Sequence, residues 1–185
     1  MKHVIIGGCA RSGKTTLSLK LRDKGFIHYK MDTIKRGLDN NFYAGKIKLW
    51  TDASPKFAKL ITRIISEADT DIISGIEWYI IDTTHLYPKD IVSIYNPKNT
   101  IIVFLGYPNM NAKDKVKKIR EYDPKNGWTW TKDDLFLENS AKEDIEYSIE
   151  AKKECEENNI MFFDTEDFNK GINEAYNYII NNLND

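Results

Sequence analysis

Eight residues near the start of the chain have the types and spacing needed to hold a phosphate group. They follow the pattern G-x-x-x-x-G-K-[ST]. Glycine lets the chain turn so that successive backbone N–H groups point at an anion, and the start of a following helix adds unpaired N–H groups. With the next residue, they are the predicted nucleotide-binding residues: Gly8, Cys9, Ala10, Arg11, Ser12, Gly13, Lys14, Thr15 and Thr16.

Two side chains of this segment indicate a nucleoside triphosphate with Mg²⁺. Lys14 would bring a mobile cation to the outer phosphates, and Thr15 would offer its hydroxyl to the metal. A chance match in a glycine turn is the alternative. The context favours the motif, because residues 2–6 are typical of a short buried strand and residues 15–24 of a helix.

The elements that must position this loop alternate along the chain. The predicted strands are 2–6, 26–31, 78–82, 100–105 and 160–163. The predicted helices are 15–24, 33–40, 55–68, 88–95, 110–121, 133–158 and 167–183, with Asn139 as a point where the sixth could break. Apolar strands alternating with helices predict a single three-layer α/β/α domain over residues 1–185, with a five-stranded parallel sheet and a nucleotide at the carboxyl ends of its strands.

Length, charge and cysteine content narrow the class of protein. A chain of 185 residues is long enough for one domain with a good core. A net charge of −1 provides no basic field for nucleic acid or a membrane surface. We expect a cytoplasmic protein, because there is no long apolar run or signal peptide and two cysteines suit a reducing compartment.

The chain resembles the nucleoside- and metabolite-kinase group of phosphate-loop proteins, to which adenylate kinase is related. The resemblance rests on the start GGCARSGKTT, an aspartate after the second strand, another near residue 82 and a basic helical insertion before the last strand. Residues 104–108, FLGYP, also resemble a branch of small bacterial kinases without a settled substrate. A GTP-binding switch protein would need an N-K-x-D segment to recognise guanine, and the sequence has none.

Asp32 is the predicted general base. It follows the second strand, so it should lie at the carboxyl edge of the sheet, where it could take the proton of a substrate hydroxyl. The group often has a basic residue four positions later, and Arg36 would there bind an anionic part of the acceptor from the same helix face. The alternative is that Asp32 caps the helix and Arg36 is its solvated partner.

Asp82 ends a hydrophobic strand and resembles the second nucleotide-binding motif, whose aspartate orients Mg²⁺. A simple Asp-Thr turn at the strand end is the alternative. Glu77 competes for the metal role, and His85 at the same edge is interpreted as structural.

Residues 109–133 resemble a lid, and a solvated amphipathic helix is the alternative. Arg120 is the predicted catalytic arginine, which would stabilise charge on the transferred phosphoryl group. Related lids often carry two or more arginines, and lysine cannot replace their planar fork. The segment instead carries lysines beside one arginine: Lys113, Lys115, Lys117 and Lys118.

Several aromatic residues are candidates for contacts with the substrates. Trp128 and Trp130 would point the same way if the segment were extended. They could stack on an aromatic ring of a substrate, or they could pin the lid to the body, which is the interpretation that we favour. Tyr43 and Trp50 lie in the region that covers the acceptor in this group, and residues 165–168 resemble the place where adenine is held.

Together these features predict a kinase that uses ATP and Mg²⁺ to phosphorylate a small molecule. Its catalytic residues would be Lys14, Asp32 and Arg120, and its metal-binding residues Thr15 and Asp82. A nucleotide, a sugar acid or another hydroxyl metabolite would fit as acceptor. The alternatives are an ATP-binding regulatory protein or slow ATPase, and a kinase acting on a macromolecule such as a polynucleotide end.

Overall fold

A computed structural model of the chain describes residues 1–41, 54–70, 78–84 and 86–183, with side chains left undescribed at 39–41. Five parallel strands form one sheet in this part of the chain, in the order β2-β3-β1-β4-β5. They are β1 (His3–Gly8), β2 (Ile27–Lys30), β3 (Tyr79–Asp82), β4 (Thr100–Gly106) and β5 (Met161–Asp164). The predicted five-stranded parallel sheet is therefore confirmed.

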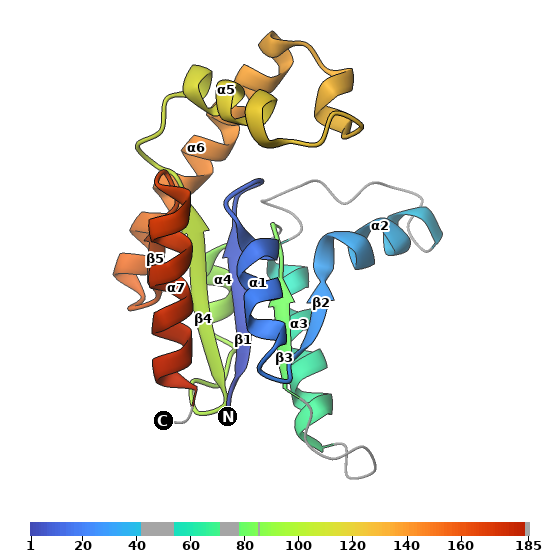
Figure 1. Ribbon diagram of the computed structural model, residues 1–185. Helices are drawn as coiled ribbons and strands as arrows, with labels where there is room; N and C mark the ends of the chain where they lie inside the picture. The colour runs from blue at the N-terminus through green and yellow to red at the C-terminus, as the bar shows by residue number, and fades with distance from the viewer. Residues whose placement is uncertain (42–53, 71–77, 85, 184–185) are drawn as a thin grey trace.

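Helices cover both faces of the sheet, which confirms the three-layer architecture (Figure 1). They are α1 (Lys14–Arg22), α2 (Met31–Asn41), α3 (Ser54–Thr70), α4 (Pro88–Val92), α5 (Ala112–Tyr122), α6 (Asp134–Glu157) and α7 (Phe168–Asn182). Side chains alternate along a strand, so Val4 and Ile6 pack with α1 and α7, whereas Ile5 packs with α3 and α4. Both faces of the sheet are buried in this way, as the uninterrupted apolar strands require.

Most helix ends lie within two residues of the prediction, and two helices differ from it in a larger way. The break expected at Asn139 is wrong, because α6 runs unbroken from Asp134 to Glu157. Its buried positions keep helical spacing through the exposed Asn139, so packing holds the helix together there. Helix α4 ends at Val92, three residues before its predicted end. A turn follows in which the N–H of Tyr95 donates to the carbonyl of Ile91.

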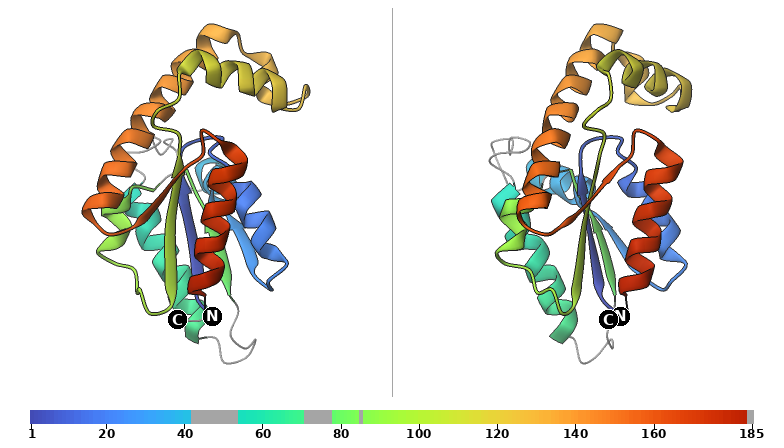
Figure 2. Two further views of the ribbon diagram at one scale, coloured as in Figure 1. Left: turned by 60° about the vertical axis from the view of Figure 1, so that its left-hand side comes forward. Right: turned by 90° about the vertical axis from the view of Figure 1, so that its left-hand side faces the viewer.

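A helical cap stands over the carboxyl ends of the strands (Figures 1 and 2). It consists of α5, the 3₁₀ helix Trp128–Thr131 and the first half of α6, held together by a small core of Val116, Ile119 and Leu137. The chain reaches it directly from the end of β4. None of the helices that the structure describes has the length and apolar character needed to cross a membrane.

Candidate functional site

The loop between β1 and α1 has the backbone shape that its glycines predict. Gly8 and Gly13 have φ angles of 139° and 97°, in the region that favours glycine. A Cβ on Gly8 would lie 2.1 Å from the carbonyl oxygen of Leu105, which belongs to the neighbouring strand backbone and cannot move away easily. The first glycine of the motif is therefore required by packing as well as by backbone conformation.

Lys14 reaches back over this loop. Its Nζ donates to the carbonyl oxygen of Cys9 over 2.6 Å, and the side chain is buried. Burial lowers the pKa of Lys14, against the raising effect of nearby groups that include Asp32 and Asp82. Ser12 Oγ is a buried hydroxyl with no hydrogen-bond partner among the described residues. A mobile ammonium and an unsatisfied hydroxyl beside a helix start fit a bound phosphate group.

Three side chains fix the outer side of the loop, and of these only Lys115, as one of the lysines of the lid-like segment, was singled out from the sequence. Tyr107 donates its hydroxyl to the carbonyl of Ala10 over 2.8 Å, and Asp144 Oδ1 accepts from the N–H of Ala10 over 3.2 Å. Lys115 Nζ donates to the carbonyl of Arg11 over 3.1 Å. The N–H and carbonyl of Ala10 and the carbonyl of Arg11 are thus held by side chains of α6, α5 and the residue that follows β4.

Burial perturbs the ionisation of two of these groups. It raises the pKa of Asp144 to about 6, although the Ala10 N–H and the ammonium groups of Lys14 and Lys115 act in the opposite direction. It lowers the pKa of Lys115 to about 8. The sequence carried a signal for Asp144, because this carboxylate falls in the buried stripe of α6 between Ala141 and Tyr147.

The two predicted metal-binding residues lie together. Asp82 ends β3, where it pairs in register with Ile6 of β1, and its side chain is buried. Its Oδ2 accepts from Thr15 Oγ1 over 3.1 Å and contacts His28 Nε2 over 3.0 Å. A hydroxyl beside a carboxylate is an oxygen donor set of the kind that Mg²⁺ prefers. His28 was not foreseen as part of this group.

Asp32 and Arg36 line the same cleft as the two predicted metal-binding residues. Asp32 falls in the first turn of α2, and its Oδ1 accepts from the hydroxyl of Thr84 over 2.9 Å. Arg36 is exposed, and its Nε donates to the carbonyl of Asp32 over 3.2 Å. Both residues line a cleft of about 1810 Å³ together with Lys14, Thr15 and Asp82. The structure therefore gathers five of the six predicted catalytic, substrate and metal residues around one space.

Arg120 is the sixth, and it points elsewhere. Its Nε and Nη2 donate to Asp134 Oδ1 over 2.9 and 2.6 Å, while Nη1 and Nη2 donate to the carbonyls of Thr129 and Lys132 over 3.0 and 2.8 Å. It does not line the cleft. All three guanidinium nitrogens are used inside the helical cap, so the structure does not bring Arg120 to the phosphate loop.

The tryptophan pair lies in a 3₁₀ helix instead of an extended segment. Trp128 stacks against the guanidinium of Arg11, whose Cζ is 4.8 Å from the ring centroid, and lines the cleft. Trp130 stacks against Arg120 at 5.2 Å and donates its Nε1 hydrogen to the carbonyl of Asp123 over 3.2 Å. Trp128 therefore contacts the phosphate loop, as expected of a residue that pins the cap to the body, whereas these contacts of Trp130 lie within the cap.

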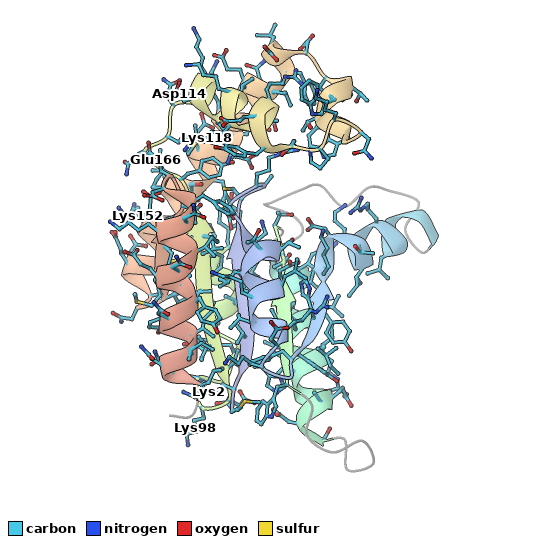
Figure 3. All side chains as sticks on the ribbon, in the orientation of Figure 1. Lys2, Lys98, Asp114, Lys118, Lys152 and Glu166 are labelled. Atoms are coloured by element: carbon cyan, nitrogen blue, oxygen red, sulfur yellow. The ribbon has the colours of Figure 1, made fainter. Side chains whose placement is uncertain are left out.

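The cleft continues between the cap and the segment after β5. Residues 164–170 line it, including the predicted adenine-holding stretch 165–168. Lys118 of α5 donates to the carbonyl of Glu166 over 2.8 Å, and Figure 3 shows the two labelled residues facing each other across this end. The candidate residues Tyr43, Trp50, Glu77 and His85 lie outside the described residues.

Comparisons with known proteins support the fold assignment. No protein-family model matches the sequence, and no curated protein matches it. Among solved structures, a gluconokinase from Sinorhizobium meliloti 1021 has a TM-score of 0.59 at 10% identity, covering 97% of this chain and 92% of that one. A sugar kinase from Janibacter sp. HTCC2649 has a TM-score of 0.57 at 16% identity, covering 99% and 96%.

A third solved structure agrees with these two. Shikimate kinase from Bacteroides thetaiotaomicron has a TM-score of 0.54 at 14% identity, covering 98% of each chain. The identities are too low to carry more than the fold. This chain, with its five-stranded parallel sheet flanked by helices, has the same fold as these solved small-molecule kinases.

Proposed function

We propose that this protein is a kinase that transfers the γ-phosphoryl group of ATP, bound with Mg²⁺, to a hydroxyl or phosphate of a small molecule. The observation that carries the proposal is the convergence of three features on one cleft. These are the phosphate loop with Lys14, the Thr15–Asp82 pair and the carboxylate of Asp32. The kinases of similar fold support a small molecule as the acceptor.

Each residue has a distinct role in this proposal. Lys14 would contact the outer phosphates, and Thr15 and Asp82 would hold Mg²⁺, which when bound offsets the negative charge of the phosphates. Asp32 would orient the acceptor hydroxyl and take its proton. As the acceptor oxygen bonds to the γ-phosphorus, the bond from that phosphorus to the β–γ bridging oxygen breaks, and its electron pair leaves with ADP. Arg36 would bind an anionic group of the acceptor.

We also propose that residues 109–133 act as a lid over the cleft. This segment contacts the body through the Lys118–Glu166 and Lys115–Arg11 hydrogen bonds. Closing over the phosphates would exclude water from the transfer.

One observation favours the alternative of an ATP-binding regulatory protein or a slow ATPase. The one arginine of residues 109–133 is held inside the cap by Asp134 and does not line the cleft. A nucleotide-binding protein without catalytic arginine from its lid would bind ATP and turn it over slowly.

The experiment that separates these functions measures ADP release from ATP and Mg²⁺, with and without a panel of nucleosides, nucleotides, sugars and hydroxy acids. We expect release that depends on one class of acceptor. Release without any acceptor would favour the slow ATPase, and ATP binding without release would favour the regulatory protein.

Two variants test the assigned residues in the same assay. Asp32→Asn should lower acceptor-dependent transfer by about 10²–10⁴-fold and leave ATP affinity nearly unchanged. Lys14→Ala should weaken triphosphate binding itself. Transfer that survives in Asp32→Asn would remove Asp32 as the base, and unchanged binding in Lys14→Ala would contradict the nucleotide site.

A further inference from the structure

We propose that Arg11, within the phosphate loop, supplies the guanidinium that contacts the γ-phosphate of the bound triphosphate. This assignment rests on the proposed function and adds a catalytic residue to it. It gives a loop residue the role that the sequence suggested for Arg120. Four observations on the described part of the chain carry the argument: the backbone of Arg11, its side-chain contacts, its exposure to the cleft and the engagement of the neighbouring cations.

The backbone of Arg11 is held in an unusual conformation. Its φ angle is 54°, and Asn159 is the other non-glycine residue with a positive φ in the described residues. Side chains rarely adopt this left-handed region unless surrounding contacts fix it, and such residues cluster at functional sites. Lys115 Nζ fixes the Arg11 carbonyl, and Tyr107 and Asp144 fix the preceding Ala10 peptide.

The side chain of Arg11 is oriented by a prepared set of contacts. Its Nε donates to Asp123 Oδ2 over 2.9 Å, and the guanidinium lies against the ring of Trp128. Asp123 is itself fixed, because the same Oδ2 accepts from Thr129 Oγ1 over 3.0 Å and its carbonyl accepts from Trp130 Nε1. A guanidinium held by a carboxylate and an aromatic face loses little further freedom when it binds a phosphate.

Arg11 lines the cleft and uses only part of its donor capacity within the described residues. Within the described residues, the Arg11 side chain makes one hydrogen bond, through Nε, so the two terminal amino groups remain for a ligand. The side chain is 23% exposed and lines the cleft beside Lys14 and Thr15. Two parallel N–H donors match two oxygens of one phosphate, which is the geometry that lysine cannot reproduce.

The lysines near the loop lack the planar pair of donors, and the other arginines are held elsewhere. Lys14 and Lys115 donate to the loop carbonyls of Cys9 and Arg11, and Lys118 donates to the carbonyl of Glu166. The guanidinium of Arg120 is used by Asp134 and two carbonyls. Arg36 lies with Asp32 on the acceptor side of the cleft. Arg11 is therefore the arginine best placed for the transferred phosphoryl group.

The test compares binding of a triphosphate with binding of a diphosphate, so it needs no acceptor and no turnover. Isothermal titration would use ADP and the non-hydrolysable β,γ-imido analogue of ATP, each with Mg²⁺. A contact with the γ-phosphate strengthens binding of the triphosphate analogue and not of ADP, which has no γ-phosphate. We expect Arg11→Ala to lower the preference for the triphosphate about tenfold or more, with ADP affinity within about twofold. Arg11→Lys should restore part of the loss.

Two further variants complete the design. Arg22→Ala removes an exposed arginine from the far end of α1, the helix that follows the loop, and should leave the preference unchanged. Asp123→Asn removes the ion pair but keeps the guanidinium and should retain most of the preference. Circular dichroism and thermal melts would confirm that each variant folds.

The possible results separate the two proposals. Tight binding with an unchanged preference in Arg11→Ala would overturn the role of Arg11 and leave the kinase proposal standing. Equal losses in Arg11→Ala and Asp123→Asn would also overturn it, because Arg11 would then act only by holding the cap. Failure of the wild-type protein to bind either nucleotide would contradict the proposed function and the role of Arg11 with it.

Discussion

Thr15 Oγ1 donates to Asp82 Oδ2 over 3.1 Å, joining the first turn of α1 to the end of β3. The contact follows from the sheet, because the parallel register places Asp82 beside Ile6, two residues before the end of β1. Residues 67 positions apart in sequence are thereby brought to the same edge as the phosphate loop. Their oxygens form the pair that we assign to Mg²⁺.

Asp82→Asn should raise the Mg²⁺ concentration needed for triphosphate binding by about tenfold or more, because the amide lacks the charge that favours the cation. The measurement is a Mg²⁺ titration at a fixed concentration of the ATP analogue. Asp23→Asn, at the exposed end of α1, is the matched control and should leave the Mg²⁺ requirement unchanged. An Asp82→Asn curve that overlays the wild-type curve would remove Asp82 from the metal site.

Asp144→Asn should make the protein more stable at neutral pH. Burial raises the pKa of Asp144 in the folded protein to about 6 from the ordinary aspartate value of 3.8, so the folded protein binds this proton more tightly than the unfolded chain does. Stability conferred by the proton is full below about pH 4 and is lost as the pH rises to about 6. At pH 7, the free energy of unfolding of the variant should exceed that of the wild-type protein by at most about 3 kcal/mol.

Urea unfolding of both proteins across pH 4–8 would measure this effect. The groups that face Asp144 are Lys14 and Lys115, Tyr107 and the Ala10 N–H, to which asparagine still presents a carbonyl acceptor. The free energy of unfolding of the wild-type protein should fall relative to that of the variant between pH 4 and 6. Parallel profiles over that range would show that the carboxyl group is not held protonated by the fold.

Gly8→Ala should destabilise the protein by about 2–3 kcal/mol more than Gly25→Ala. Both glycines have positive φ angles, 139° and 89°, so both substitutions strain the backbone. A Cβ at residue 8 also meets the carbonyl oxygen of Leu105 at 2.1 Å, whereas a Cβ at residue 25 meets nothing within 4 Å. Denaturant unfolding of the two variants isolates the clash, and equal losses would mean that the strand pair moves apart without cost.

Arg120→Ala should loosen the cap. Removing the guanidinium leaves the carbonyls of Thr129 and Lys132 and the carboxylate of Asp134 without this donor. Hydrogen exchange should therefore speed up in α5 and residues 128–131, while amides of β1 and β4 keep their protection. Unchanged exchange in the cap would show that its small apolar core of Val116, Ile119 and Leu137 is sufficient without Arg120.

The fold and the inner part of the site could be predicted because they depend on local pattern. The glycine spacing specifies the loop, and the apolar strands specify a buried parallel sheet that brings Asp32 and Asp82 to one edge. Predicting these features needs only the order of the helices and strands and the rule that the carboxyl ends of parallel strands lie at the same edge of the sheet.

The outer part of the site could not be predicted because it depends on how α5 and α6 cross. Whether Arg11 or Arg120 faces the cleft is decided by the ion pairs with Asp123 and Asp134, and those depend on the angle of the cap. The contact of Asp144 with Ala10 spans 134 residues and has no local signature beyond a carboxylate in a buried stripe. Tertiary packing, not spacing along the chain, determines these contacts.

The start of β1 and the last turn of α7 lie at the amino ends of the strands, on the side of the sheet away from the cap (Figure 2). A protein anchored to a sensor surface or fused to a carrier through either end would therefore present its cleft to solution. Because the two ends also lie near each other, a short peptide could join them, and a circular permutant could open at the exposed turn after α4 without disturbing the phosphate loop.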